Sequence, residues 1–134
     1  MAAGPGSFAP PVTLARVLMR LGERDSALQL LEDVREARPP KFASAAEEDA
    51  WLLGSRVLGD LYLDDVNRPD LAVGCFLDYR TSSKSGADTL YKLGLAYERL
   101  GESATAAKYF RQVTSYDNHP LAPDAHEGLR RVKG

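Results

Sequence analysis

An alanine followed four residues later by a phenylalanine occurs twice in this chain, and the two copies are 34 residues apart. Ala72 and Phe76 form the first pair, and Ala106 and Phe110 form the second. A leucine–glycine dipeptide, with a tyrosine three residues after the glycine, precedes each pair at 58–62 and 93–97. A repeat of this length is typical of one helical hairpin, which buries its apolar face only by stacking on a neighbouring copy. The repeat therefore predicts a stack of helices.

A third copy lies upstream and matches the pattern less closely. Ala27 and Leu31 occupy the alanine and phenylalanine positions, and Pro39 closes this copy. Ala27 precedes Ala72 by 45 residues instead of 34, so the chain between these copies is longer. Together, residues 9–118 resemble the tetratricopeptide repeat (TPR), a helix–turn–helix unit. The resemblance implies an all-α, right-handed α-solenoid of about three TPR units plus a C-terminal capping helix.

Seven helices are expected from the repeat, the apolar stripes and the capping residues. They span 11–21, 25–37, 45–64, 69–81, 87–100, 103–116 and 121–133. The third begins with a capping box from Ser44 to Glu47, and within it Trp51 should supply the apolar bulk that Ser55 lacks. The last helix departs from the repeat pattern and has one apolar stripe with a polar remainder, as a terminal cap requires. Residues 1–8 are interpreted as a flexible leader and 9–134 as the TPR domain.

Composition limits the classes of function. With 134 residues, 44% of them hydrophobic, the chain is expected to form one folded domain. Its net charge of −2 argues against a protein built to grip nucleic acid. Its single cysteine excludes an internal disulfide. The first residues lack the pattern of a signal peptide, and no apolar run is long enough for direct membrane insertion, so a cytoplasmic location is expected.

Candidate chemical groups are few and scattered. His119 and His126 could bind a metal ion only if one face presented both rings, and a proline-containing helix start separates them. The acidic turn after the third helix lacks the glycine and terminal glutamate of a calcium loop. Cys75 has no histidine in its own copy to activate it, so it is interpreted as a packed apolar residue. The chain is therefore expected to be no enzyme and to bind no metal, cofactor or small-molecule substrate.

The resemblance implies that the first helix of each unit lines a concave groove. Its expected residues mix apolar side chains with both signs of charge: Arg16, Met19, Leu53, Arg56, Asp60, Leu63, Asp88, Tyr91, Leu95 and Glu98. Such a surface suits a peptide or helix with apolar anchors and flanking charges. Alternatively, a neighbouring helix covers Leu53 and Leu63. The lysine and asparagine clamp by which other TPR proteins hold a terminal carboxylate is missing.

The first helix is apolar around most of its surface. Leu14, Leu18 and Leu21 are expected to pack on the second helix, which leaves Val12, Val17 and Met19 as an end-docking patch for another protein or a second copy of the chain. The competing interpretation is that the leader folds back and Phe8 covers this patch. The sequence thus favours a protein–protein interaction module that binds in its groove. The alternative is an accessory subunit built permanently into a larger complex through its ends or convex face.

Overall fold

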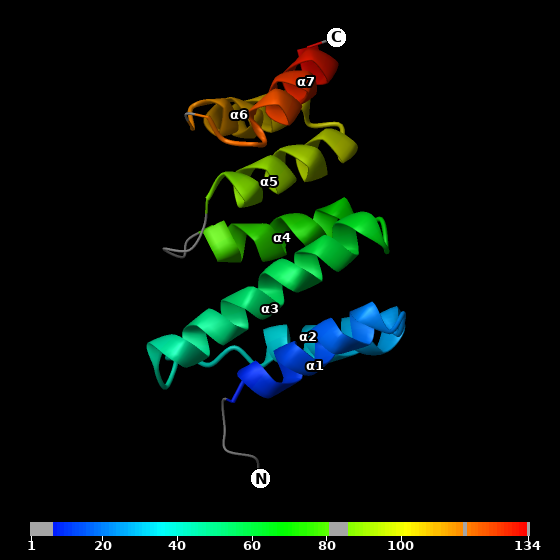
Figure 1. Ribbon diagram of the computed structural model, residues 1–134, viewed down its shortest axis with the longest axis vertical. Coiled ribbons are helices and arrows are strands. Elements are labelled where there is room, and N and C mark those ends of the chain that lie inside the picture. Colours follow the sequence, from blue (N-terminus) through cyan, green and yellow to red (C-terminus); the bar gives the residue numbers. More distant parts are fainter. Residues whose placement is uncertain (1–6, 81–85, 117, 134) are drawn as a thin grey trace.

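The computed structural model describes residues 7–80, 86–116 and 118–133, and all regular structure in these residues is helical (Figure 1). The helices are α1 (Ala9–Arg20), α2 (Arg24–Glu36), α3 (Ala45–Asp64), α4 (Pro69–Arg80), α5 (Ala87–Arg99), α6 (Ser103–Thr114) and α7 (Ala122–Lys133). They are stacked along the long axis of the molecule, with α1 and α2 at one end and α7 at the other. Each helix boundary lies close to the one expected from the sequence.

Three helical hairpins form the stack. α1 packs on α2, α3 on α4 and α5 on α6, while α2 contacts α3, α4 contacts α5 and α6 contacts α7. In the described part of the chain each of these contacts lies within a hairpin or joins it to its neighbour, which is the arrangement of a solenoid. This confirms the predicted all-α solenoid of three hairpins plus a terminal helix.

The long helix α3 begins as the sequence predicts. The Ser44 hydroxyl oxygen accepts a hydrogen bond from the Glu47 N–H at 3.1 Å. The Glu47 carboxylate does not complete the capping box but accepts from the Phe8 N–H at 2.9 Å. Phe8 is buried, and its ring lies 6.2 Å from that of Phe42. Phe8 thus belongs to the folded domain and not to the leader, whose residues 1–6 lie outside the described part of the chain.

Glycines allow the helices within each hairpin to approach closely. A Cβ added at Gly59 would lie 2.7 Å from the Phe76 ring, and one added at Gly94 would lie 2.6 Å from the Phe110 ring. Real Cβ atoms do not come this close to other heavy atoms. The 34-residue spacing of the two phenylalanines therefore reflects the same glycine–ring contact in two successive hairpins.

The terminal helix α7 repeats this contact, which the sequence analysis missed. Gly128 lies 34 residues after Gly94, and a Cβ added there would lie 2.8 Å from the opposite edge of the Phe110 ring. α7 therefore occupies the place of the first helix of a further unit. Its outer residues, including Asp124 and Arg130, are exposed, as expected for a cap.

The predicted faces of α1 are wrong for Val12, Leu14 and Leu21, whereas Leu18 packs against the core as expected. Val12 is only 2% exposed because it packs against Gly54 of α3. A Cβ added at Gly54 would lie 3.0 Å from Cγ2 of Val12. Leu14 and Leu21, expected to be packed, are exposed instead, as is Val17. α1 contacts α3 as well as α2, and this second contact turns Val12 inward. The large exposed apolar side chains of α1 and its C-cap residue are therefore Leu14, Val17 and Leu21.

Ser55 offers a test of the core of α3. Its side chain is 1% exposed, and its hydroxyl oxygen has no hydrogen-bond partner among the described residues. A buried hydroxyl without a partner costs about 1–3 kcal/mol in desolvation. We therefore expect Ser55→Ala to raise the free energy of unfolding by about 1 kcal/mol. This net gain is the desolvation cost that the substitution removes, less the packing contacts that the hydroxyl oxygen makes. Urea denaturation measures this, and a less stable variant would contradict it.

Candidate partner-binding groove

Two pockets lie along the inner side of α1, α3 and α5. The arginine pocket, with a volume of about 360 Å³, is lined by Arg16, Met19, Arg20, Arg24, Leu53, Arg56, Val57, Asp60 and Asp65. The apolar pocket, with a volume of about 590 Å³, is lined by Leu63, Asp64, Asp88, Tyr91, Lys92, Leu95, His119, Pro120 and Leu121. Most of the lining residues of both pockets come from the first helix of successive hairpins. We refer to them together as the groove.

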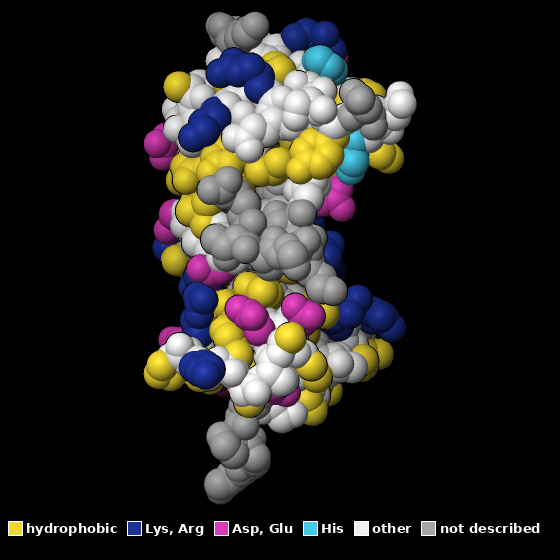
Figure 2. Space-filling view, turned by 90° about the vertical axis from the view of Figure 1, so that its left-hand side faces the viewer, with side chains coloured by type: hydrophobic (Ala, Val, Ile, Leu, Met, Phe, Trp, Pro, Cys, Tyr) yellow, Lys and Arg dark blue, Asp and Glu magenta, His cyan; other side chains and the backbone are white. Residues whose placement is uncertain are grey.

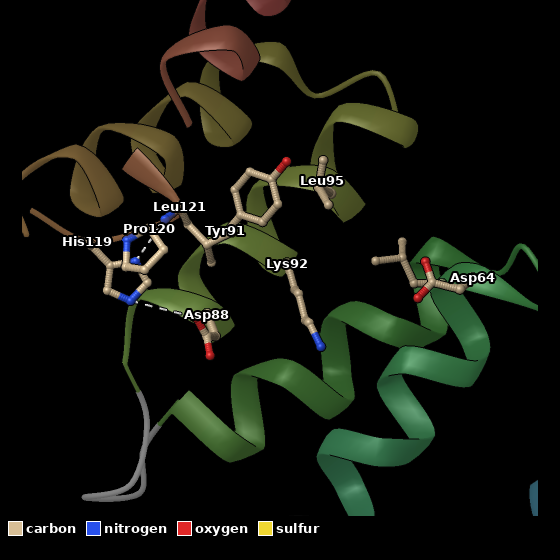
Figure 3. Close-up of a pocket in the computed structure, with 9 residues that line it drawn as sticks. Asp64, Asp88, Tyr91, Lys92, Leu95, His119, Pro120 and Leu121 are labelled. Atoms are coloured by element: carbon tan, nitrogen blue, oxygen red, sulfur yellow. Dashed lines mark hydrogen bonds and ion pairs between the residues drawn. The ribbon is translucent and has the colours of Figure 1, made fainter. Parts of the chain in front are cut away.

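The apolar pocket is built around Tyr91, whose side chain lies between Leu95 and the segment 119–121 (Figure 3). The Tyr91 ring also contacts the Phe110 ring, with 5.7 Å between centroids, so the pocket rests directly on the core. Tyr91, Leu95 and Leu121 are each half-buried. Burial raises the pKa of the Tyr91 hydroxyl, so this side chain stays neutral and can donate a hydrogen bond.

One end of the apolar pocket is organised by His119. Its Nδ1 atom accepts a hydrogen bond from the Leu121 N–H at 3.1 Å, and its Nε2 atom lies 3.7 Å from the Asp88 carboxylate (Figure 3). The hydrogen bond fixes the ring orientation, and the carboxylate ties the segment before α7 to the start of α5. At the other end Asp64, on α3, stands apart from this pair.

Ion pairs join neighbouring helices beside the groove. Lys92 of α5 lies 2.5 Å from Asp60 of α3, and the Arg99 guanidinium donates to the Leu63 carbonyl oxygen. Arg131 of α7 lies 2.7 Å from Glu98 of α5. The first two contacts join α3 to α5 and the third joins α5 to α7, so each one links successive helices along the groove.

Nine of the ten expected groove residues line these two pockets. Glu98 lines neither pocket, and its carboxylate accepts hydrogen bonds from Arg131. Leu63 is only 2% exposed, so it forms the floor of the apolar pocket and offers no protruding anchor. Met19, expected in both the groove and the end patch, lines the arginine pocket and is half-buried.

Sequence reasoning missed several lining residues, above all those before α7. His119, Pro120 and Leu121 reach the pocket because α7 stacks like the first helix of another unit. The spacing from Gly94 to Gly128 was the signal that could have placed them there. Lys92 was also missed, since periodicity places a residue on a helix face but does not identify its partner on the next hairpin.

The structure also describes the candidate metal ligands, the acidic turn and the single cysteine. Among the described residues, no cluster of three or more histidine, cysteine, aspartate or glutamate side chains could hold a metal ion. Two carboxylates of the acidic turn face arginines, Asp65 at 3.3 Å from Arg24 and Asp70 at 2.9 Å from Arg68. Cys75 is fully buried, and burial raises the pKa of its thiol to about 11, which keeps it protonated at neutral pH.

Comparison with known protein families finds a match for one segment of the chain. Residues 88–119, which span most of α5, all of α6 and the chain up to His119, match the family model described as tetratricopeptide repeat. No curated protein sequence matches the chain. None of the described helices combines the length and the apolar character that crossing a membrane requires.

Proposed function

We propose that this chain, an all-helical stack in which residues 88–119 match the tetratricopeptide repeat model, is a protein–protein interaction module that binds a peptide or helix of a partner protein in its groove. The observation that supports this proposal is the apolar pocket around Tyr91. Its half-buried apolar side chains are bordered by Asp64 and Asp88. An apolar centre with a polar rim is the usual anatomy of a protein-binding site.

Contacts between the helices that line the groove support the same proposal. The pairs Lys92–Asp60 and Arg131–Glu98 bridge successive helices, and Tyr91 rests on the buried Phe110. A partner that enters a preformed groove does not have to order these side chains, so more of the interaction free energy remains as affinity. The proposed activity is therefore recognition without catalysis.

A pair of truncations in the apolar pocket tests this proposal. Tyr91→Ala combined with Leu95→Ala should weaken partner binding by about 2–4 kcal/mol, because apolar anchors at the centre of an interface dominate its affinity. Leu63 is not a suitable target because it is buried and its loss would disturb the fold. The measurement is capture of partners from native extract on immobilised protein, followed by titration of the captured partner.

Leu71→Ala serves as the matched control for these truncations. Leu71 lies on α4, is exposed and lines neither pocket. Circular dichroism should show that all variants keep their helical content. If the double variant captures the same partner with unchanged affinity, the partner binds elsewhere and groove binding is excluded.

The exposed stripe on α1 favours a second candidate function, that of a fixed subunit in a larger complex. Leu14, Val17 and Leu21 are spaced by three and four residues, so they share one face of the helix at the N-terminal end of the stack. A terminal unit that stood alone would need a polar outer face. This stripe suits permanent docking to another protein or to a second copy of the chain.

Charged substitutions on this stripe distinguish the two candidates. Leu14→Glu with Leu21→Glu should leave binding in the groove intact but dissociate a complex that docks through α1, since two buried carboxylates would lose their hydration. Light scattering on the chain alone, and on the complex purified from extract, measures the change in mass. A wild-type chain that stays monomeric, and whose partners are all retained by the variant, would eliminate docking through α1.

A further inference from the structure

We infer that the groove is electrically bipolar and recognises a partner segment of matching polarity. The segment carries acidic side chains over the arginine pocket, and an apolar anchor next to basic side chains in the apolar pocket. This inference rests on the proposed function of the groove and adds the chemistry and direction of the partner.

Three arginines of the arginine pocket are available to a partner. Arg16 and Arg20 lie one turn apart on α1, and Arg56 faces them from α3. Among the residues that the structure describes, none of these three guanidinium groups has an ion pair or a side-chain hydrogen bond. Like charges gathered around one hollow repel each other, and an acidic partner relieves that repulsion.

The acids that line the same pocket do not compensate these arginines. Asp65 lies 3.3 Å from Arg24, and Asp60 lies 2.5 Å from Lys92. Both carboxylates therefore already face a cation of their own. The field of the arginine pocket is consequently set by Arg16, Arg20 and Arg56.

The apolar pocket has the opposite sign. Asp64 has no ion pair within the described part of the chain, and Asp88 is 66% exposed at the side chain with only His119 beside it. The single lysine of this pocket, Lys92, is engaged by Asp60. An apolar anchor seated on Tyr91 would therefore lie between two carboxylates, which favours lysine or arginine next to the anchor.

The two pockets are close enough to serve one segment. A smaller hollow lies between the two pockets. It is lined by Arg56, which also lines the arginine pocket, and by Asp88 and His119, which also line the apolar pocket. Figure 2 shows the outline hollowed at mid-height on its right-hand side, with a histidine and an acidic side chain above the hollow and basic side chains below it. The groove thus runs continuously from its positive to its negative half.

A protein segment fits this pattern better than a nucleic acid. A phosphate backbone is negative along its whole length, so the arginine pocket would attract it and the carboxylates of the apolar pocket would repel it. A peptide can change the sign of its charge within a few residues. The net charge of −2 of the chain agrees with this choice.

Designed peptides test the bipolar groove directly. The probe is a fluorescein-labelled peptide with three glutamates at one end, two leucines in the middle and three lysines at the other end, made in both chain directions. Peptides of the same length with glutamates at both ends, or lysines at both ends, are the comparison. We expect one bipolar peptide to bind about tenfold more tightly than either comparison peptide, measured by fluorescence anisotropy at low salt.

Variants then assign each half of the groove. Arg16→Gln with Arg20→Gln should weaken binding of the bipolar peptide about tenfold and should not weaken binding of the peptide with lysines at both ends, because that peptide loses a repulsion. Asp64→Asn with Asp88→Asn should weaken binding of the bipolar peptide and should not weaken binding of the peptide with glutamates at both ends, because that peptide also loses a repulsion. Arg111→Gln is the matched control, since Arg111 is exposed on α6 and lines neither pocket.

The possible failures of the two proposals are distinguishable. If all peptides bind equally and Tyr91→Ala with Leu95→Ala still abolishes binding, the groove binds peptides but its polarity plays no part, and the bipolar inference is overturned. If no peptide binds, or if a labelled single-stranded oligonucleotide binds through the arginine pocket more tightly than every peptide, the inference is overturned as well. Partner capture that depends on Tyr91 would still support the proposed function in either case.

Discussion

Phe110→Ala should lower the free energy of unfolding by about 3–5 kcal/mol, a large fraction of the total stability of a domain of this size. The Phe110 side chain is fully buried. Gly94 of α5 and Gly128 of α7 border opposite edges of its ring, and the Tyr91 ring lies 5.7 Å away. Its removal would leave a cavity where α5, α6 and α7 meet, and the helix backbones beside it cannot collapse freely.

Chemical denaturation followed by circular dichroism measures this loss. Thiol labelling gives an independent readout, because Cys75 is the single cysteine of the chain and is fully buried, so a reagent reaches it when the domain opens. Leu100→Ala is the matched control, since Leu100 is exposed at the end of α5, and it should cost less than about 1 kcal/mol. Equal destabilisation by the two variants would contradict the central role of the Phe110 ring.

The same substitution links the core to the groove. Tyr91 rests on Phe110, so a cavity beneath it would leave its ring free to sink or to change rotamer. We therefore expect Phe110→Ala to weaken peptide binding even at a temperature where the variant remains folded. The apolar pocket is in this respect an extension of the hydrophobic core.

Much of the fold could be predicted from the sequence because local chemistry and a fixed period determine it. Ser44 caps α3 and Pro69 begins α4, as expected from the sequence. Trp51 fills the core beside Ser55, and its indole N–H donates to the Val34 carbonyl oxygen at 3.0 Å. The helix starts and the place of Trp51 beside Ser55 depend on residues within one or two turns, whereas the Trp51 bond to Val34 joins two hairpins and was not predicted.

Features that depend on how one hairpin turns against the next could not be predicted. Val12 is buried because α1 meets Gly54, which lies outside the repeated pattern. The Lys92–Asp60 pair joins residues 32 apart on different hairpins. Whether these two side chains meet depends on how far one hairpin is rotated relative to the next. Ion pairs between hairpins also determine which charged groups of the groove remain available to a partner. The expected acids Asp60 and Glu98 are engaged by cations, whereas the expected arginines remain available.

Gly94→Leu should destabilise the fold by about 3 kcal/mol, at the upper end of the cost of overpacking a core. Even the first atom of the new side chain would lie 2.6 Å from Cε1 and 2.7 Å from Cδ1 of Phe110. The ring cannot retreat, since its opposite edge already faces Gly128 of α7. A leucine in place of glycine also gains about 1 kcal/mol of helix propensity, which is too little to offset the overlap.

Two further variants make the explanation of this loss testable. Gly86→Ala is the matched control, because no heavy atom lies within 4 Å of the added Cβ and the backbone φ of −156° is extended, so its stability should change little. Gly94→Ala combined with Phe110→Leu should be more stable than the sum of the two single effects predicts, since the smaller side chain vacates the space that the Cβ needs. Additive effects in the double variant, or an unchanged midpoint of urea denaturation for Gly94→Leu, would show that contact between Gly94 and the Phe110 ring does not limit how closely α5 and α6 pack.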